Sequence, residues 1–255
     1  MAVITLTKGS VKTIEKAVDR LFDRIKGRAL GPDFFKYNGD KKIYIGYKPA
    51  YSLPGLYRTS AMSEDVEPNE RVLNGLVKVA SGYLDAERER VKSKVIHAVN
   101  AWLLTNPTAS AETVLSGELA PVWKETLDNV GKIIDTESTA ARNMGTLEGV
   151  SQIAAARGID DPNVFFIVVR DKHLCEECSR IHLMPDGKTP RVFKMSELSG
   201  GYHKRGDDTP CVGGLHPYCR CSLVNLAPGY GFTDAGMIKF VEVGHDAHAA
   251  QGDLP

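Results

Sequence analysis

The chain has 255 residues, of which 32 are basic, 32 are acidic and 42% are hydrophobic. This length and apolar content are sufficient to bury one or two cores. A net charge of zero argues against a protein that binds DNA mainly by neutralising phosphates. No apolar run approaches the roughly 20 residues that a membrane-spanning helix needs, so we expect no membrane span.

Two features of the sequence bear on the compartment. Residues 1–8 lack the basic region and long apolar core of a signal peptide. The cysteine count, five, is odd and fits poorly with a disulfide-bonded secreted protein. We therefore expect a cytoplasmic protein with reduced cysteines.

The first predicted element, in residues 1–30, is an amphipathic helix with Ser10 as its N-cap. Charged residues occupy one face, and apolar residues recur at spacings of three and four on the other: Val11, Ile14, Val18, Leu21 and Ile25. Packing within the chain is the simpler interpretation of the apolar face. Docking onto another subunit is the alternative.

Residues 31–68 are predicted to form an extended aromatic arm. They are rich in Gly, Pro and Asn, and only Lys42–Tyr47 has the pattern of a short strand. Seven aromatic residues fall here: Phe34, Phe35, Tyr37, Tyr44, Tyr47, Tyr51 and Tyr57. Aromatic side chains bury much contact area with few rotatable bonds, which suits a protein interface. An arm that wraps the protein's own helices fits equally well.

Residues 69–158 are predicted to form a helical body. One long helix is expected from Asn69 to Leu104, ending before Pro107, and a second helical block from about Ala111 to Arg157. We expect breaks in this second block near Gly117 and Pro121, with a further one near Gly131. Gly158 is the expected C-terminal cap.

A cysteine- and histidine-rich module is predicted in residues 159–227. All five cysteines lie between Cys175 and Cys221, in a Cys-x-x-Cys pair, a single Cys211 and the run from His216 to Cys221. Two soft ligands separated by two residues can point at one centre from a tight turn, and a second such pair completes the tetrahedron that Zn²⁺ prefers. The sequence therefore predicts a structural zinc site.

The predicted ligand set is Cys175, Cys178, His216 and Cys219, with Cys221 and Cys211 as alternates. Cys221 would project to the opposite side from Cys219 if both were part of an extended strand. Cys211 is the weakest candidate. A thioredoxin-like redox role for the first pair leaves the second pair unexplained, so metal binding is the preferred interpretation.

The last segment, residues 228–255, is predicted to be a tail with a turn at Pro228–Phe232 and a short element from Ala235 to Val243. His245 and His248 are expected to be solvent-exposed rather than metal-bound. The predicted fold class is α+β: a helical N-terminal body with an extended aromatic arm and a small zinc-pinned C-terminal α/β module.

From Ile133 to Leu223 the chain resembles the phage head-morphogenesis family typified by the Mu F protein. The resemblance rests on three sets of residues: Thr136-Glu137, Arg142-Asn143 and Gly145 on a helix; Arg170–Cys175 followed by Cys178; and His216-Pro-x-Cys219-Arg-Cys221. The chain departs from the family pattern in its long insert between the half-sites, in the extra Cys211, and in Val212–Leu215 where relatives carry prolines. The match covers about a third of the chain.

This resemblance implies a minor capsid protein, without enzymatic activity, that acts at the portal vertex during head assembly and has a role in DNA packaging or ejection. Portal protein, other head proteins, further copies of the chain and weakly bound packaged DNA are the implied partners. The implied location is the host cytoplasm during assembly and then the virion head near the portal vertex.

Two other functions compete with this one. The first is a metal-dependent nuclease of the His-Cys type, using His182, His203 and His216 beside Asp186, Asp207 and Asp208. The second is a DNA-binding zinc module, for which the basic candidates are Lys188, Arg191, Lys194, Lys204, Arg205 and Arg220. Glu137 and Arg142 are catalytic candidates by residue type, although a salt bridge is the simpler interpretation.

Overall fold

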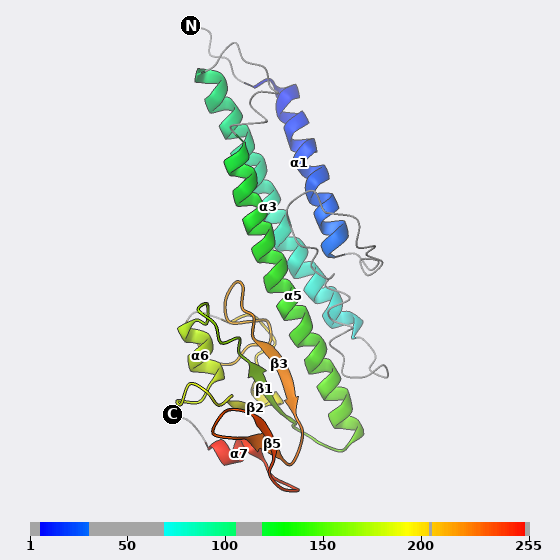
Figure 1. The fold of residues 1–255 in the computed structure, drawn as a ribbon. Helices are drawn as coiled ribbons and strands as arrows, with labels where there is room; N and C mark the ends of the chain where they lie inside the picture. The colour runs from blue at the N-terminus through cyan, green and yellow to red at the C-terminus, as the bar shows by residue number, and fades with distance from the viewer. Residues whose placement is uncertain (1–5, 31–68, 106–118, 204–205, 253–255) are drawn as a thin grey trace, which may run out of the picture. The chain divides into compact units, whose positions relative to one another are not determined.

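The computed structural model describes residues 6–30, 69–105, 119–203 and 206–252. It divides into two compact units (Figure 1). Unit 1 comprises Met1–Ser52 and Val77–Ile134, and unit 2 comprises Leu53–Leu76 and Asp135–Pro255. The predicted arm, with its seven aromatic residues and the Lys42–Tyr47 strand, lies outside the described residues.

Helix α1 spans Lys8–Ala29 and begins earlier than predicted. Its N-cap is Thr7, whose side chain accepts a hydrogen bond from the backbone N–H of Ser10 at 3.1 Å. The prediction of Ser10 as N-cap was therefore wrong. Threonine is nearly as good a cap as serine, and a glycine in the first turn, here Gly9, does not prevent the helix from starting before it.

The core of unit 1 is formed by apolar stripes on three helices: α1, α3 (Glu70–Thr105) and α5 (Ala120–Ala156). The α1 stripe is Val18, Phe22, Ile25 and Ala29, so Phe22 is a core residue that the sequence analysis missed. Buried residues from the other elements of this unit are Leu84, Val91, Val95, Val99, Leu119, Val130 and Ile134. Spacings of three and four place each stripe on one helix face, as predicted.

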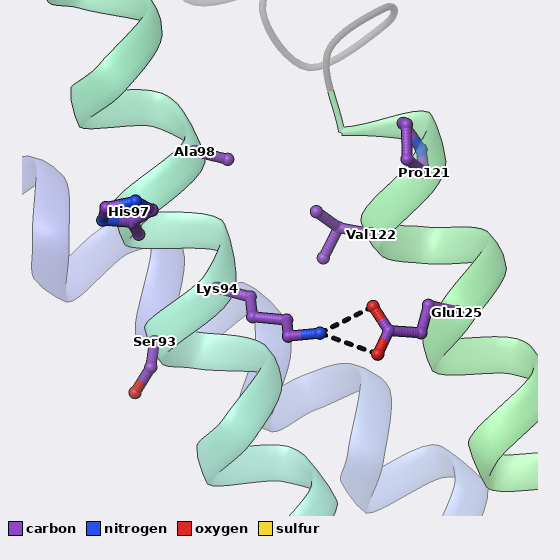
Figure 2. Close-up of a pocket in the computed structure, with 7 residues that line it drawn as sticks. All are labelled: Ser93, Lys94, His97, Ala98, Pro121, Val122 and Glu125. Atoms are coloured by element: carbon purple, nitrogen blue, oxygen red, sulfur yellow. Dashed lines mark hydrogen bonds and ion pairs between the residues drawn. The ribbon is translucent and has the colours of Figure 1, made fainter.

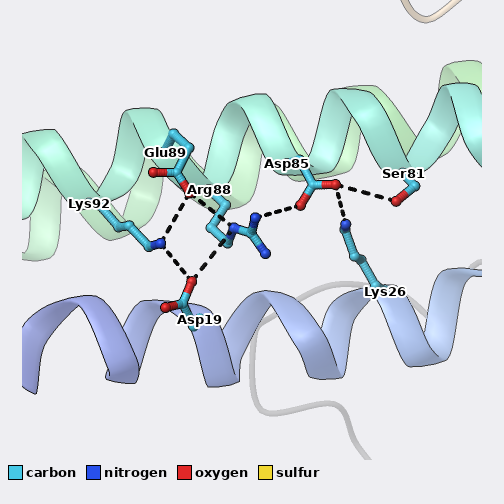
Figure 3. Close-up of polar contacts among 7 residues, drawn as sticks. All are labelled: Asp19, Lys26, Ser81, Asp85, Arg88, Glu89 and Lys92. Atoms are coloured by element: carbon cyan, nitrogen blue, oxygen red, sulfur yellow. Dashed lines mark hydrogen bonds and ion pairs between the residues drawn. The ribbon is translucent and has the colours of Figure 1, made fainter.

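Ion pairs flank the contact between α1 and α3 (Figure 3). Lys92 Nζ lies 2.7 Å from Asp19, and Arg88 lies 2.9 Å from Asp85, which also pairs with Lys26. The Lys26 ammonium is the largest cause that lowers the pKa of Asp85. Partly exposed pairs of this kind contribute less than about 1 kcal/mol each to stability. Their main effect is therefore on the orientation of α1 against α3.

A buried carboxylate lies between α3 and α5. Glu87 is 7% exposed, and its carboxylate accepts hydrogen bonds from Arg90 at 2.5 and 2.7 Å and from Asn129 at 3.3 Å. Nearby, a groove between the two helices is spanned by the Lys94–Glu125 pair at 2.6 Å (Figure 2).

Helix α5 is continuous through Gly131, where a break was predicted. Helix α3 likewise runs unbroken through Gly75 and Gly82, where an added Cβ would meet nothing within 4 Å. A single glycine costs a helix only about 1 kcal/mol, which packing on both sides offsets. Pro121 lies in the first turn of α5, so the break expected near it is the start of this helix. Gly158, with φ of 68°, follows the end of α5, as predicted.

Unit 2 contains a three-stranded antiparallel sheet of order β2-β1-β3. The central strand β1 is Asn163–Ile167, and its neighbours are β2 (Val192–Lys194) and β3 (Ser222–Leu226). Both sheet faces are covered. Val164 and Phe166 pack in a cluster with helix α6 (Glu176–His182), while Phe165 packs with helix α7 (Ala247–Gln251).

The C-terminal segment is more ordered than predicted. Strands β4 (Tyr230–Phe232) and β5 (Ile238–Phe240) form a hairpin, so the turn expected at Pro228–Phe232 is partly strand. A 3-10 turn, η1, at Met195–Glu197 completes the elements. The mixture of helices and antiparallel strands confirms the α+β class. None of the described helices is long and apolar enough to cross a membrane.

Candidate metal centre

Cys175 and Cys178 are brought together by the start of α6. Cys175 is the N-cap residue, with φ −84° and ψ 155°. Its Sγ atom accepts a hydrogen bond from the backbone N–H of Cys178 at 3.2 Å. The cap therefore aims both sulfurs at one region.

His216 and Cys219 are brought together by a tight turn, in which the backbone N–H of Cys219 donates to the carbonyl of His216 at 3.0 Å. Tyr218 in this turn has φ of 64°, the one positive φ of a residue other than glycine in the described chain. Such a conformation costs about 1 kcal/mol or more. A hydrogen bond at 3.0 Å from the N–H of Tyr218 to Oγ1 of Thr136, on α5, helps to hold it.

The two half-sites converge. The Nε2 atom of His216 lies 3.1 Å from Sγ of Cys175 and 3.2 Å from Sγ of Cys178. The sulfurs of Cys178 and Cys219 are 3.8 Å apart. Zn–S bonds of about 2.3 Å at tetrahedral angles place two sulfurs about 3.8 Å apart, so this pair already has the separation of two zinc ligands.

The imidazole of His216 is oriented for metal binding. Its Nδ1 atom lies 2.7 Å from the carbonyl oxygen of Pro217, so Nδ1 carries the proton and donates it. The lone pair is then on Nε2, the atom that faces the cysteines. A backbone acceptor on the second ring nitrogen is the usual support for a ligating histidine.

Cys221 also belongs to the cluster. The ligand atoms of Cys178, Cys219 and Cys221 all lie within 4.8 Å of one another, as do those of Cys175, Cys178 and His216. The prediction that Cys221 points away from Cys219 was wrong. Strand β3 begins only at Ser222, so the alternation of a strand does not apply to the preceding residues.

Cys211 lies outside both groups. It is 1% exposed, and its thiol donates to the carbonyl of Thr209 at 3.4 Å. Burial raises the pKa of this thiol, as expected for a cysteine away from any cation. The described geometry therefore favours four cysteines and one histidine as metal-binding candidates: Cys175, Cys178, His216, Cys219 and Cys221.

The close approach of the sulfur atoms favours the binding of a cation by this cluster. The hydrogen bond between Cys178 and Cys219 raises the pKa of Cys178 far above its usual range and lowers the pKa of Cys219 far below it. One thiolate is thus stabilised at the expense of its neighbours. A divalent cation would remove this competition, because it displaces the remaining protons and balances the negative charge.

The chain matches no protein-family model, no curated protein and no solved structure. The geometry of the cysteine–histidine cluster and the motif resemblance are thus what support a function.

Asn143 of α5 is a supporting residue whose role the sequence analysis missed. Its side chain is 1% exposed. Nδ2 donates to the carbonyls of Val212 and Cys221, both at 3.1 Å, and Oδ1 accepts from the N–H of Leu223 at 2.9 Å. One amide therefore holds the segments before and after the second half-site against α5. The available signal was the Arg142-Asn143 pair of the motif.

Glu137 is buried on the same helix, 2% exposed. Its carboxylate accepts a hydrogen bond from the hydroxyl of Tyr202 at 2.5 Å. Burial raises its pKa, and the Tyr202 hydrogen bond opposes this effect. The expected salt bridge is therefore replaced by a phenol–carboxylate contact that links α5 to the insert between the half-sites.

Arg220 and Asp171 join the flanks of the two half-sites through a bidentate pair, with both N–O distances at 2.8 Å. The Arg220 guanidinium lowers the pKa of Asp171 below its usual range.

Of the other basic residues proposed for DNA binding, Lys194 pairs with Asp246 at 2.8 Å. Lys204 and Arg205 lie outside the described residues.

The histidines proposed for nuclease chemistry have separate environments. His203 contacts Glu177 at 3.4 Å and the carbonyl of Asp207, and His216 belongs to the metal cluster. His182 is 1% exposed and stacks on Phe166, with centroids 4.1 Å apart. Neither of its ring nitrogens has a hydrogen-bond partner among the described residues.

The predicted exposure of His248 was wrong, since His248 is half-buried and contacts Glu197 at 3.1 Å.

Burial of His182 predicts a loss of stability in acid. Desolvation lowers its pKa from 6.5 to about 4. Between these two values the unfolded chain binds more protons than the folded one. The contribution of neutral His182 to the free energy of unfolding is therefore complete above pH 6.5 and is lost as the pH falls. We expect about 2 kcal/mol less unfolding free energy at about pH 5 than at about pH 7.5 from this residue.

The measurement is urea unfolding at both pH values in zinc-saturated buffer, for the wild type and for His182→Leu. In His182→Leu, unfolding should take up about one proton fewer, so its free energy of unfolding should depend less on pH than that of the wild type. Acid effects on the cysteine–histidine cluster are common to both proteins. An unchanged pH dependence in His182→Leu would show that His182 is not the titrating group.

Proposed function

We propose that the chain is a minor head protein of a tailed phage that acts at the portal vertex during head assembly, with one structural Zn²⁺ in unit 2. The observation that carries this proposal is the convergence of the Cys-x-x-Cys pair with the His216–Cys221 segment. Both are elements of the motif resemblance, of which the His216–Cys221 segment is the most specific, and they form one cluster although about 40 residues separate them.

The donor set fits zinc in a structural role. Thiolates and imidazole are the ligands that zinc prefers, and four protein donors close its tetrahedron without an open position for water. Cys175, Cys178, His216 and Cys219 are the proposed ligands, and Cys221 is the alternate fourth. When bound, the ion supplies a crosslink between α6 and the segment that precedes β3. No catalytic residue is assigned.

The purified reduced protein is expected to bind about one Zn²⁺ per chain. Cys178→Ser should lose most of this zinc, because Cys178 is shared by both groups of ligand atoms. Cys211→Ser is the matched control, as a buried cysteine outside the cluster, and should keep its zinc. Metal analysis after gel filtration checks this. Equal zinc contents in the two variants would contradict the site.

Comparison of Cys175→Ser, Cys219→Ser and Cys221→Ser then assigns the ligands. The proposed set predicts zinc loss in the first two and retention in the third. If Cys221→Ser loses zinc and Cys219→Ser keeps it, the metal site stands with Cys221 as the fourth ligand.

The role in head assembly is tested by a reconstruction of particles assembled with and without the chain. We expect density for the chain at the portal vertex and fewer complete heads in its absence. A protein that is found free of particles, and that cuts DNA in a zinc-dependent reaction abolished by His216→Ala without loss of fold, would instead support the nuclease alternative.

A further inference from the structure

A line of basic residues runs along helix α1. Each is exposed and lies four residues from the next: Lys8, Lys12, Lys16, Arg20, Arg24 and Arg28. Positions four residues apart are about 6 Å apart along a helix axis and about 40° apart around it. The line is therefore about 30 Å long. It crosses obliquely the side of α1 that lies opposite the buried stripe of Val18, Phe22, Ile25 and Ala29.

The charges of this line are not neutralised within the part of the chain that the structure describes. None of its residues has an ion-pair partner there. The other basic residue of α1, Lys26, is half-buried and pairs across to α3, as does the acidic Asp19 (Figure 3). The two remaining acids of α1, Glu15 and Asp23, offset two of the six positive charges and leave a net charge of four.

This side of α1 is thus strongly basic although the whole chain has a net charge of zero. Basic residues gathered along one helix form the electrostatic pattern of a surface that binds nucleic acid. Averaging over the whole sequence conceals such a pattern, because acidic residues elsewhere in the chain cancel it in the total.

Two other kinds of anionic surface fit α1 less well. A helix that binds a membrane inserts its apolar face into the lipid. The apolar face of α1 is instead part of the core of unit 1, where Val18 and Phe22 are 1% and 0% exposed. A protein partner would be anchored by large apolar or aromatic side chains, and none of the described residues of α1 is an exposed one of this kind. A regular polyanion requires neither feature.

We propose that this line of six residues, here called the basic ridge, binds the phosphate backbone of double-stranded DNA. Its four central residues, Lys12, Lys16, Arg20 and Arg24, lie within about 120° of one another around the helix, so they can face one duplex together. Contacts with phosphates carry no base information, so the binding is independent of DNA sequence. The proposal goes beyond the role in head assembly and does not involve the metal centre.

The test is fluorescence anisotropy of the zinc-loaded full chain with a labelled duplex of arbitrary sequence, about three helical turns long. The affinity should fall steeply with salt. The slope of log K against log salt should be about −3.6 if the four central residues each neutralise one phosphate. Lys12→Gln combined with Lys16→Gln should weaken binding about tenfold or more at low salt and should reduce the steepness of this slope by about two.

Lys124→Gln combined with Lys239→Gln is the matched control. It removes the same charge from two exposed lysines, on α5 and β5, that have no ion-pair partner among the described residues. This variant should bind DNA as the wild type does. Glutamine has nearly the helix propensity of lysine, so α1 should stay folded in the ridge variant, which far-ultraviolet circular dichroism checks.

Chelation of the zinc separates the basic ridge from a DNA-binding zinc module. Binding through α1 should persist, because α1 belongs to unit 1 and the cysteine–histidine cluster belongs to unit 2. The proposal is overturned if the wild type does not bind the duplex at low salt, if the two lysine variants bind equally well, or if chelation abolishes binding.

Two further probes address the other anionic surfaces. Tighter binding to phosphatidylserine vesicles than to the duplex would assign the basic ridge to a membrane. Tighter binding to polyglutamate would assign it to an acidic protein. Either result would overturn the proposal, whereas preference for the duplex supports it.

Discussion

Chelation of the metal is expected to unfold the sheet of unit 2 while the three-helix core of unit 1 remains folded. Cys178, Cys219 and Cys221 are not appended to the core of unit 2 but are members of it, packed with Val164, Phe166 and Ile181. Without a cation, these buried sulfurs compete for protons. Formation of a structural zinc site and folding are one process, worth about 10–16 kcal/mol in zinc-finger peptides.

The fluorescence of the two tryptophans of the chain provides one test of this prediction. Trp102 and Trp123 both pack against the core of unit 1. Their fluorescence should therefore stay constant on chelation, while amide hydrogens in β1 and β3 lose protection from exchange. Zinc should restore the protection. Strands that stay protected in the metal-free protein would show that apolar packing alone is sufficient and that the ion is dispensable for folding.

The cysteines and histidine that cluster in the candidate site were accessible from sequence because zinc chemistry constrains residue type and spacing together. The position of Cys221 was not accessible. It depended on where β3 begins, and the boundary of a strand is decided by pairing with β1, to which Ser222 is the first contributor. A shift of one residue in that boundary changes which side a cysteine faces.

The helices were predicted largely because apolar periodicity is a local property. The predicted helix start and buried face were wrong where two neighbouring residues suited the same role and the rest of the fold selected one of them. Thr7 and Ser10 are both competent caps, and the helix starts at the earlier one. Phe22 was missed because it and Leu21 are adjacent, and packing against α3 and α5 buries Phe22 more completely.

The polar residues that position the site were beyond local inference. Glu137 and Asn143 lie on a helix, where glutamate and asparagine are normally solvent-facing. Their partners are 65 to 80 residues away in sequence. Only the three-dimensional arrangement shows that these side chains satisfy backbone and side-chain groups of the segments around the cysteine–histidine cluster.

Asn143→Ala is expected to destabilise unit 2 by about 3 kcal/mol or more and to weaken zinc binding. The substitution leaves two carbonyls and one N–H without their buried partner, namely those of Val212, Cys221 and Leu223. Each such orphaned group costs about 1–3 kcal/mol. The zinc affinity falls with the stability, because Cys221 and its neighbours are no longer held against α5.

Asn129→Ala is the matched control for this substitution. Asn129 lies on the same helix but in unit 1, and its amide makes one 3.3 Å hydrogen bond to Glu87. Both changes gain the same small helix propensity, so the difference between them isolates the buried network. Hydrogen exchange in β3 measures stability, and competition with a chromogenic chelator measures zinc affinity. If Asn143→Ala changes both no more than Asn129→Ala does, the amide of Asn143 does not hold the metal-binding segment in place.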